Sequence, residues 1–383
     1  MAGRQTFLRW PDFPGAATLE RGRLGHGWGR DFAGSRRRAV GEVVEIASCA
    51  AWGDERIVEA SYLEVSDRAW HPSELTGFSD AQRANRRDWN DRLDGLDWIP
   101  PGLPSARPIG WMEARDPLSG RTILVPADAV LIGRREAGEE SACVVADTNG
   151  CAAGVDRDSA LLAALYELIE RDATGRWWYG LRPRAQIDPL RLEGGSEIRR
   201  SLERRGRILR LVDITTDIGI PTVAAIAADG QGRAVALGFA ACGRLDAAAQ
   251  AALGELLQTE LAIHVEMEHR GTNPRLGDWL RAVDLRGSPL LGADARWASA
   301  RTGGGDAADL PACLSALERR GCRVAILDLT RSAFDVPVFR AVSPDLCHWK
   351  PRFGRRRLLA LDENDIPPEH SGRSGVNGVY LMI

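Results

Sequence analysis

The chain has 383 residues, of which 44% are hydrophobic, and a formal net charge of −3 at pH 7. This length and apolar content indicate a globular α/β protein with a large core, in one domain or two. The near-neutral charge argues against nucleic-acid binding, and no apolar run reaches the roughly 18 residues that a membrane span needs. Cysteines without a CxxC pair and an N-terminus without an apolar signal segment predict a reduced cytoplasmic location.

The first third of the chain is expected to contain one amphipathic helix followed by a strand and a long loop. Residues 1–24 are irregular in pattern and are expected to cap the core. A helical apolar stripe predicts a helix over 36–51, and alternation predicts a strand over 56–65. The segment 79–110 is rich in Arg, Asp, Trp and Pro, so we expect a surface loop insertion.

The rest of the chain alternates between strand and helix signals. A hairpin is expected over 111–126, because five turn-forming residues separate two apolar runs. A strand is expected at 142–146, then a glycine loop and a helix from about Asp158. Another long helix is expected over 246–268.

One pattern occurs three times, and each copy has small residues followed at a fixed spacing by two polar residues at i, i+3. The copies are Gly25, Gly29, Glu42 and Glu45; Gly150, Gly154, Glu167 and Glu170; and Gly238, Cys242, Glu255 and Gln258. Residues three apart on a helix project from the same face and can reach one ligand together. The triplication indicates a shared site, whereas a single pair would be read as an ordinary solvated helix face.

If these glutamates converge, their mutual repulsion calls for cations. Two like charges about 4 Å apart repel by roughly 1 kcal/mol in water and about 4 kcal/mol at an effective dielectric of 20. Magnesium suits such a site because it binds a few carboxylate oxygens together with waters and substrate phosphates. The pattern therefore predicts a magnesium–nucleotide site, and an unrelated glutamate-ligated metal hydrolase is the alternative.

A second, longer repeat indicates internal duplication of the fold. The segment Leu202 to Pro221 recurs from Leu317 to Pro337, with Asp213 and Thr215 matching Asp328 and Thr330. Each copy predicts a helix end, a glycine stop, an apolar strand and a loop that closes on proline before another strand. The period is too long for a solenoid and predicts a pseudo-symmetric α/β core.

The runs DTNGCAAG, ALYELIERDA, DITTDIGIP and ALGELLQTELA, in this order, resemble the YcaO family, and the similarity extends from about Gly25 to Pro344. The resemblance implies a single YcaO-like domain over 1–383. It also implies use of ATP and Mg²⁺ to activate a backbone amide in the maturation of a ribosomally made peptide. An internal Cys, Ser or Thr would give an azoline, and external sulfide would give a thioamide.

The resemblance also implies the roles of the site residues. Magnesium would be held by Glu42, Glu45, Glu167 and Glu170. Arg171 would contact phosphate or brace Glu167, and Glu255 with Gln258 would complete the nucleotide pocket. The family motifs have Ser, Arg, Asn and Glu where this chain has Arg38, Ile46, Val155 and Ser159. Arg38 would either replace a cation or fill the site.

The implied partners are a precursor peptide and a leader-binding protein, with a TfuA-type protein as one possibility for thioamidation. A homo- or hetero-oligomer is compatible with the sequence. A rival hypothesis from another class is a non-catalytic YcaO-like scaffold that binds the peptide or an active partner.

Overall fold

The computed structural model describes residues 4–9, 24–29, 31–135, 138, 141–181, 184–269, 274–286, 290, 309–360 and 380–381. Within these ranges the strands form three sheets, and every pair of neighbouring strands is antiparallel. The mixed α/β fold class predicted from the sequence is confirmed. No helix in these ranges is both long enough and apolar enough to cross a bilayer.

The three sheets differ in size. The smallest pairs β1 (Arg4–Arg9) with β2 (Leu24–Gly29). The second has the order β10-β9-β8-β7, from Ala236–Ala241, Thr222–Asp229, Arg207–Asp213 and Gln186–Ile187. The third has the order β3-β4-β11-β12-β6, from Val58–Ser61, Pro108–Arg115, Ala325–Asp328, Val338–Val342 and Cys151–Ala153, with β5 (Thr122–Pro126) on β4.

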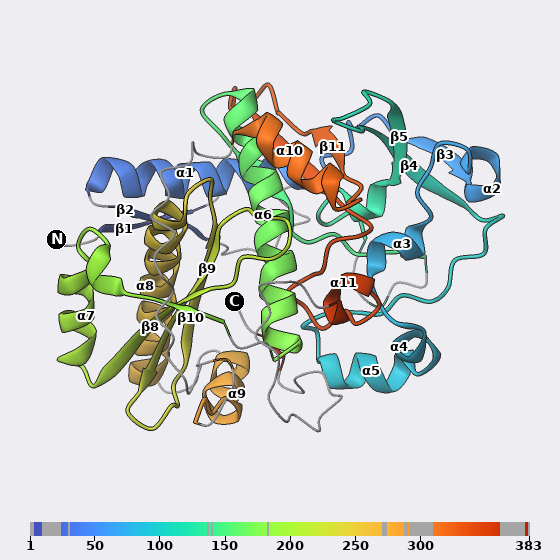
Figure 1. Ribbon diagram of the computed structural model, residues 1–383. Helices are drawn as coiled ribbons and strands as arrows, with labels where there is room; N and C mark the ends of the chain where they lie inside the picture. The colour runs from blue at the N-terminus through green and yellow to red at the C-terminus, as the bar shows by residue number, and fades with distance from the viewer. Residues whose placement is uncertain are drawn as a thin grey trace.

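Three long helices organise the molecule: α1 (Phe32–Cys49), α6 (Arg157–Tyr179) and α8 (Leu245–His269). Helix α6 runs through the middle of the molecule (Figure 1). It contacts both β12 of one sheet and β10 of another. The shorter helices are α2 (Tyr62–Val65), α3 (Pro72–Thr76), α4 (Asp80–Ala84), α5 (Arg86–Leu93), α7 (Gly195–Glu203), α9 (Pro274–Ala282), α10 (Leu310–Arg319) and α11 (Arg356–Leu359), with 3-10 turns at Ala127–Ala129 and Pro189–Arg191.

The predicted long helices are confirmed with small shifts at their starts. Helix α1 begins before position 36 because the Asp31 carboxylate caps it, accepting a hydrogen bond from the Gly34 N–H at 2.6 Å. Helix α6 is capped in the same way by Asp156, which accepts from the Ser159 N–H at 2.7 Å. The hairpin expected over 111–126 is also confirmed, as β4 and β5.

The prediction of a surface loop insertion at 79–110 is wrong for much of that segment. It contains α4 and α5, and Gln82, Leu93 and Ile99 are buried. Ser79 and Gln82 form a capping box that starts α4, and this spacing was a readable helix signal. The Gln82 side-chain amide donates to the Pro351 carbonyl, and its oxygen accepts from the Phe353 N–H. The segment is therefore packed against the C-terminal part of the chain.

Three further expectations need correction. The segment 142–146 forms no strand, although Ala142, Cys143 and Val144 are buried. Only 58–61 of the expected strand at 56–65 is extended, since Ser61 caps the short helix α2. Residues 1–24 are not wholly irregular, because 4–9 form a strand paired with β2; positions 1–3 and 10–23 lie outside the described residues.

The long repeat is visible as two matching turns in two different sheets. In one, the Asp213 carboxylate accepts from the Thr215 N–H at 3.0 Å, and the Thr215 hydroxyl accepts from the Thr222 N–H at 3.0 Å. In the other, Asp328 accepts from the Thr330 N–H at 3.0 Å, and the Thr330 hydroxyl accepts from the Val338 N–H at 3.1 Å. The internal duplication predicted from the sequence is therefore present in the fold.

Candidate active site

Three strand–turn–helix units, β2–α1, β6–α6 and β10–α8, meet around one cavity. Helix α1 contacts β6 of the second unit, α6 contacts β10 of the third, and α8 contacts β2 of the first. Each helix therefore packs on the strand of the following unit, and the third unit closes back on the first. These units are the three copies of the glycine–glutamate pattern.

The glycines of the pattern set the distance between strand and helix within a unit. A Cβ added at Gly25 would lie 2.6 Å from the Ala39 carbonyl oxygen, and one at Gly238 would lie 2.3 Å from that of Ala252. Because neither backbone can yield to such contacts, only glycine allows this approach. The constant spacing between glycine and glutamate thus has a packing cause, separate from the chemistry of the glutamates.

The cavity has a volume of about 940 Å³, which suits a small-molecule or cofactor site. All seven residues singled out in the sequence line it: Glu42, Glu45, Glu167, Glu170, Arg171, Glu255 and Gln258. Of the four positions that depart from the family motifs, Arg38 and Val155 also line the cavity, whereas Ile46 is in the core and Ser159 takes part in the capping box of α6.

Three of the four glutamates of the first two units accept hydrogen bonds from strand N–H groups, yet the ionised forms of all four remain unfavourable. Burial, followed by the charge of Glu167, raises the pKa of Glu45 well above its usual value, although the Ala153 N–H donates to Glu45. Burial raises the pKa of Glu167 to about 8 in spite of nearby Arg171. Burial also raises the pKa of Glu170, which accepts a hydrogen bond from the Ala241 N–H.

The remaining two glutamates show the same trend. Burial raises the pKa of Glu42, although the His26 N–H donates to its carboxylate at 2.7 Å and the His26 ring Nδ1 lies 3.2 Å from it. The Glu255 side chain is open to the cavity, but the surrounding protein removes enough water to raise its pKa to about 7, with the charge of Glu170 adding to the effect. Sequence reasoning did not single out His26, which lies on the glycine-rich strand β2.

Arg171 offsets only part of this charge. Its guanidinium lies 3.4 Å from the Glu167 carboxylate and 3.0 Å from that of Glu170. Within the described part of the chain, its buried Nε has no hydrogen-bond partner. Among the described residues, six acids and three arginines line the cavity. An excess of desolvated carboxylates is the environment that bound cations stabilise, so the residues present fit magnesium.

The described residues do not include three His, Cys, Asp or Glu side chains close enough to enclose one metal ion. The site is therefore a carboxylate-lined cavity. Magnesium at nucleotide sites commonly takes one or two carboxylates and completes its shell with waters and phosphates, so it does not need an all-protein cage.

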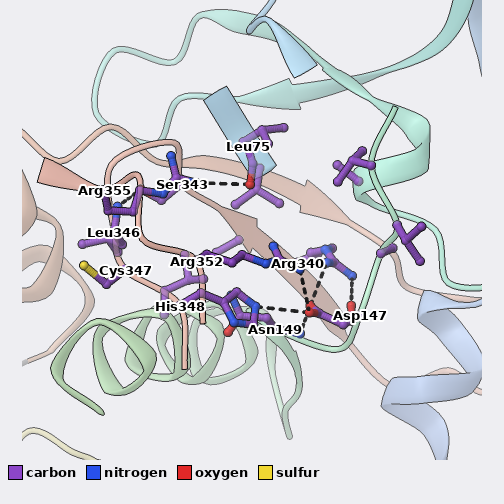
Figure 2. A pocket seen from close by; sticks show the side chains of 17 residues that line it. Leu75, Asp147, Asn149, Arg340, Ser343, Leu346, Cys347, His348, Arg352 and Arg355 are labelled. Atoms are coloured by element: carbon purple, nitrogen blue, oxygen red, sulfur yellow. Dashed lines mark hydrogen bonds and ion pairs between the residues drawn. The ribbon is translucent and has the colours of Figure 1, made fainter. Parts of the chain in front are cut away.

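A second, smaller cavity of about 60 Å³ lies near the loop that precedes β6 (Figure 2). Asp147 of this loop lies 3.1 Å from His348 Nε2 and 3.3 Å from Lys350 Nζ. The Lys350 N–H donates to His348 Nδ1, so the proton of the neutral ring is on Nε2 and faces Asp147. Arg340 donates to the Asp147 carbonyl at 2.7 Å and thereby holds the start of the loop.

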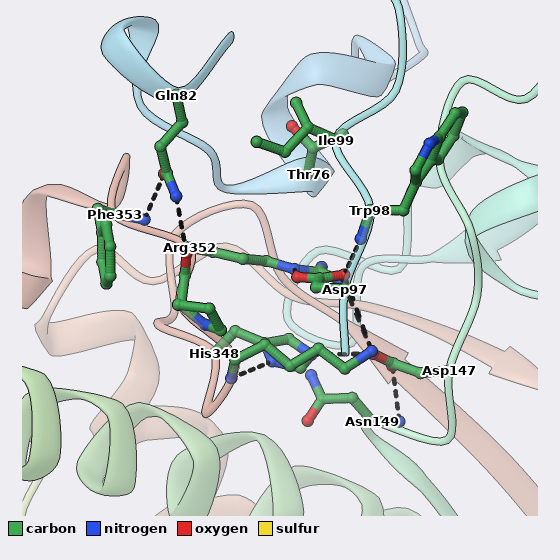
Figure 3. A network of polar contacts seen from close by, with 12 residues as sticks. Thr76, Gln82, Asp97, Trp98, Ile99, Asp147, Asn149, His348, Arg352 and Phe353 are labelled. Carbon is green, nitrogen blue, oxygen red and sulfur yellow. Dashed lines mark hydrogen bonds and ion pairs between the residues drawn. The ribbon is translucent and has the colours of Figure 1, made fainter. Parts of the chain in front are cut away.

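The same network reaches the segment mispredicted as a loop. Arg352 donates to the Asp97 carboxylate at 2.7 Å and lies between Asp97 and Asp147 (Figure 3). Burial would raise the pKa of Asp147, but Lys350 and then His348 outweigh it and hold this pKa well below its usual range. Sequence reasoning missed this network because its members come from three separate segments and match no spacing pattern.

Comparison with known proteins identifies the family. The family model for the YcaO cyclodehydratase, ATP- and Mg²⁺-binding, matches residues 26–347. A heterocyclase solved in complex with substrate and cofactor is 26% identical, with a TM-score of 0.80 over 88% of this chain and 46% of that one. The heterocyclase TruD is 25% identical, with a TM-score of 0.74 over 91% of this chain and 50% of that one.

Other relatives agree with this assignment. The fold is shared with YcaO from Methanopyrus kandleri bound with AMPPCP and Mg²⁺, at 21% identity and a TM-score of 0.60 over 85% of this chain and 79% of that one. An uncharacterised protein in the tfuA 3′ region of Rhizobium leguminosarum bv. trifolii is 33% identical over 44% of this chain and 40% of its own length.

A protein of Methanothermobacter thermautotrophicus is 30% identical over 36% of this chain and 37% of its own length, so the matched part spans well under half of each curated relative. The two heterocyclase chains are likewise covered over only about half their length. The family model, in contrast, covers most of the present chain. The chain belongs to the YcaO family, whose cofactors are ATP and Mg²⁺.

Proposed function

We propose that this protein uses ATP and Mg²⁺ to activate a backbone amide of a ribosomally synthesised peptide, in azoline-forming cyclodehydration or in thioamidation. The observation that carries the proposal is the convergence of five glutamates from three repeats on one cavity, with pKa values raised by burial. Family membership and the similarity to heterocyclases supply the reaction class.

Each of the seven predicted site residues has a role in this proposal. Glu42, Glu45, Glu167 and Glu170 would hold magnesium, each ion using one or two of them. When bound, magnesium neutralises phosphate charge and so supports phosphoryl transfer. Arg171 braces Glu167 and Glu170, and its Nε–H, which has no partner among the described residues, would donate to an oxygen of the ligand. Glu255 and Gln258, from α8, would complete the nucleotide pocket.

The nucleophile and the partner protein are the open parts of the proposal. The relative in the tfuA 3′ region supports thioamidation with a TfuA-type partner, and the heterocyclase structures support azoline formation. In both cases the second substrate is a precursor peptide, presented by a leader-binding protein.

Mass spectrometry of a candidate precursor peptide tests the proposal. The peptide is incubated with the protein, its partner and Mg-ATP, and with each component left out in turn. Loss of one water would indicate a ring, and exchange of oxygen for sulfur would indicate a thioamide. A modification that proceeds equally well without ATP would contradict the proposal.

A non-catalytic scaffold is the second candidate, and the observation that favours it is the presence of Arg38 and Val155 in the cavity wall. Calorimetric titration with Mg-ATP separates the two. A catalytic site should bind Mg-ATP and lose that binding in Glu167→Ala, whereas a scaffold with a decayed cavity should give no heat of binding.

A further inference from the structure

Trp28 interrupts the agreement between the three repeats. It stands in the first copy at the position that Ala153 occupies in the second and Ala241 in the third, each at the same distance from Gly25, Gly150 and Gly238. The two alanines only donate a backbone N–H to a glutamate of the preceding unit. Trp28 instead places an indole ring where the third unit closes on the first.

Helix α8 is shaped to receive this ring. A Cβ added at Gly254 would lie 2.0 Å from a Trp28 ring atom, so the ring rests directly against the helix backbone. The equivalent position is Gly41 in the first helix, where an added Cβ would meet nothing, and Tyr166 in the second. The Trp28 indole also hydrogen-bonds the Glu255 carboxylate. The ring is therefore fixed by α8 at the edge of the cavity.

The Trp28 ring also stacks against the side chain of Arg38. The guanidinium carbon of Arg38 lies over the Trp28 ring, 4.4 Å from its centroid, and its Nη1 donates to the Trp28 carbonyl at 2.9 Å. Both residues line the cavity. Over the residues that the structure describes, no ion pair joins Arg38 to a carboxylate, whereas Arg171 is paired with two. Arg38 thus presents a positive charge and further N–H donors to the cavity.

We propose that Arg38 is a phosphate-binding residue of the nucleotide site and that Trp28 positions it. This inference rests on the proposed function, because it assumes that the cavity holds Mg-ATP. A guanidinium presents paired N–H donors that match phosphate oxygens, and stacking on an aromatic ring fixes its plane. The nucleotide brings further negative charge into a cavity that already has an excess of acids. Arg38 therefore replaces a cation in this site and does not fill it.

Calorimetry with two probes tests the role of Arg38. Charged hydrogen bonds contribute roughly 1.5–3 kcal/mol, so Arg38→Ala should weaken Mg-ATP binding by about 10- to 100-fold and leave adenosine binding unchanged. Arg38→Lys should recover part of the loss, because it keeps the charge without the planar fork. Arg36→Ala is the matched control, since Arg36 is exposed on the same helix and outside the cavity wall.

The role of Trp28 is tested by coupling. Trp28→Phe keeps a ring under Arg38 and should retain most of the affinity for Mg-ATP. Trp28→Leu should weaken Mg-ATP binding, and Arg38→Ala should weaken it by a smaller factor in the Trp28→Leu background than in the wild type, because Trp28 positions Arg38. Equal effects of Arg38→Ala in the two backgrounds would contradict the positioning role. The circular dichroism spectrum of each variant establishes that it is folded. Because the Arg38 side chain is exposed, the Arg38 variants test the inference even if a Trp28 variant does not fold.

Two outcomes would overturn the inference. Arg38→Ala could bind Mg-ATP as tightly as the wild type or more tightly, which would mean that Arg38 fills the site. Alternatively, Arg38→Ala could weaken adenosine and Mg-ATP equally, which would place Arg38 away from the phosphates. If the wild type itself binds no Mg-ATP, the proposed function fails and this inference fails with it, so the two failures are distinguishable.

Discussion

The acids of the large cavity and those of the network around Asp147 are both desolvated, but their pKa values move in opposite directions. Burial raises the pKa of Glu45, Glu167 and Glu255 in the cavity. In the network, the pKa values of Asp97 and Asp147 are lowered, because arginine, lysine and histidine neighbours outweigh burial. The difference lies in whether the protein supplies the opposite charge.

This contrast distinguishes the proposed binding site from a structural network. The Asp147 network is balanced within the protein, so its contribution is to hold the loop before β6 and the segment around Asp97 in place. In the cavity the carboxylates outnumber the positive charges that the protein supplies. Only a bound ligand can therefore stabilise these carboxylates in their ionised form. The same residue type therefore serves two purposes, and its surroundings decide which.

The largest effect is expected from removing a cavity carboxylate. Glu45→Gln and Glu167→Gln should each lower ATP-dependent turnover by about 10²–10³-fold, because a group that stabilises charge at the reaction centre is lost. Their melting temperatures without ligand should be equal to that of the wild type or higher, since a buried carboxyl that must take up a proton when the chain folds at neutral pH is replaced by a neutral amide. Full ATP-dependent activity in both variants would contradict the site assignment.

The opposite variant removes a network carboxylate. Asp147→Ala should destabilise the protein by up to about 3–5 kcal/mol, because it leaves two buried cations, Lys350 and Arg352, to share the carboxylate of Asp97. Chemical denaturation measures this change in the free energy of unfolding. Asp80→Ala is the control: its exposed pair with Arg83, at 3.4 Å, should contribute less than about 1 kcal/mol. Equal stability of the two variants would remove the distinction between the regions.

The smallest effect is a pH dependence of stability without ligand. A raised pKa in the folded state means that stability falls as pH rises through it, and for Glu167 this window extends from 4.5 to about 8. His348, whose pKa burial lowers from 6.5 to about 4, opposes this trend only below pH 6.5. The free energy of unfolding should therefore decrease between pH 6.5 and 8, and less so in Glu167→Gln or with Mg²⁺ present. A wild type that gains stability across this window would contradict the pKa assignment.

The local features of the site could be predicted from the sequence, whereas its long-range features could not. The glutamate pairs were predictable because both members lie on one helix and the spacing recurs in three copies. Trp28 and His26 lie on a short glycine-rich strand, so no periodicity marked them. The Asp147 network and the ring formed by the three units depend on which segments meet in space, and spacing within one segment carries no such information.

The fold shows the same division. The long helices and the hairpin at 111–126 follow from apolar periodicity and turn residues, and their predicted positions agree with the structure to within a few residues. The prediction for 79–110 is wrong because polar content does not reveal that its buried residues are held by distant partners, such as Gln82 by Pro351. The segment 142–146 is apolar and its first three residues are buried, but it does not pair as a strand, and apolar content alone does not distinguish the two cases.

The closed order of the three strand–turn–helix units has a consequence for dividing the chain. A carboxylate on α1 is oriented by an amide of β6, one on α6 by an amide of β10, and one on α8 by the indole of β2. No single strand–turn–helix unit therefore contains all the groups that would surround a ligand. Deleting any one unit would remove its contacts with both of the other units. Truncation and domain-swapping designs should therefore keep 24–269 together with β11 and β12, because β6 is paired with β12.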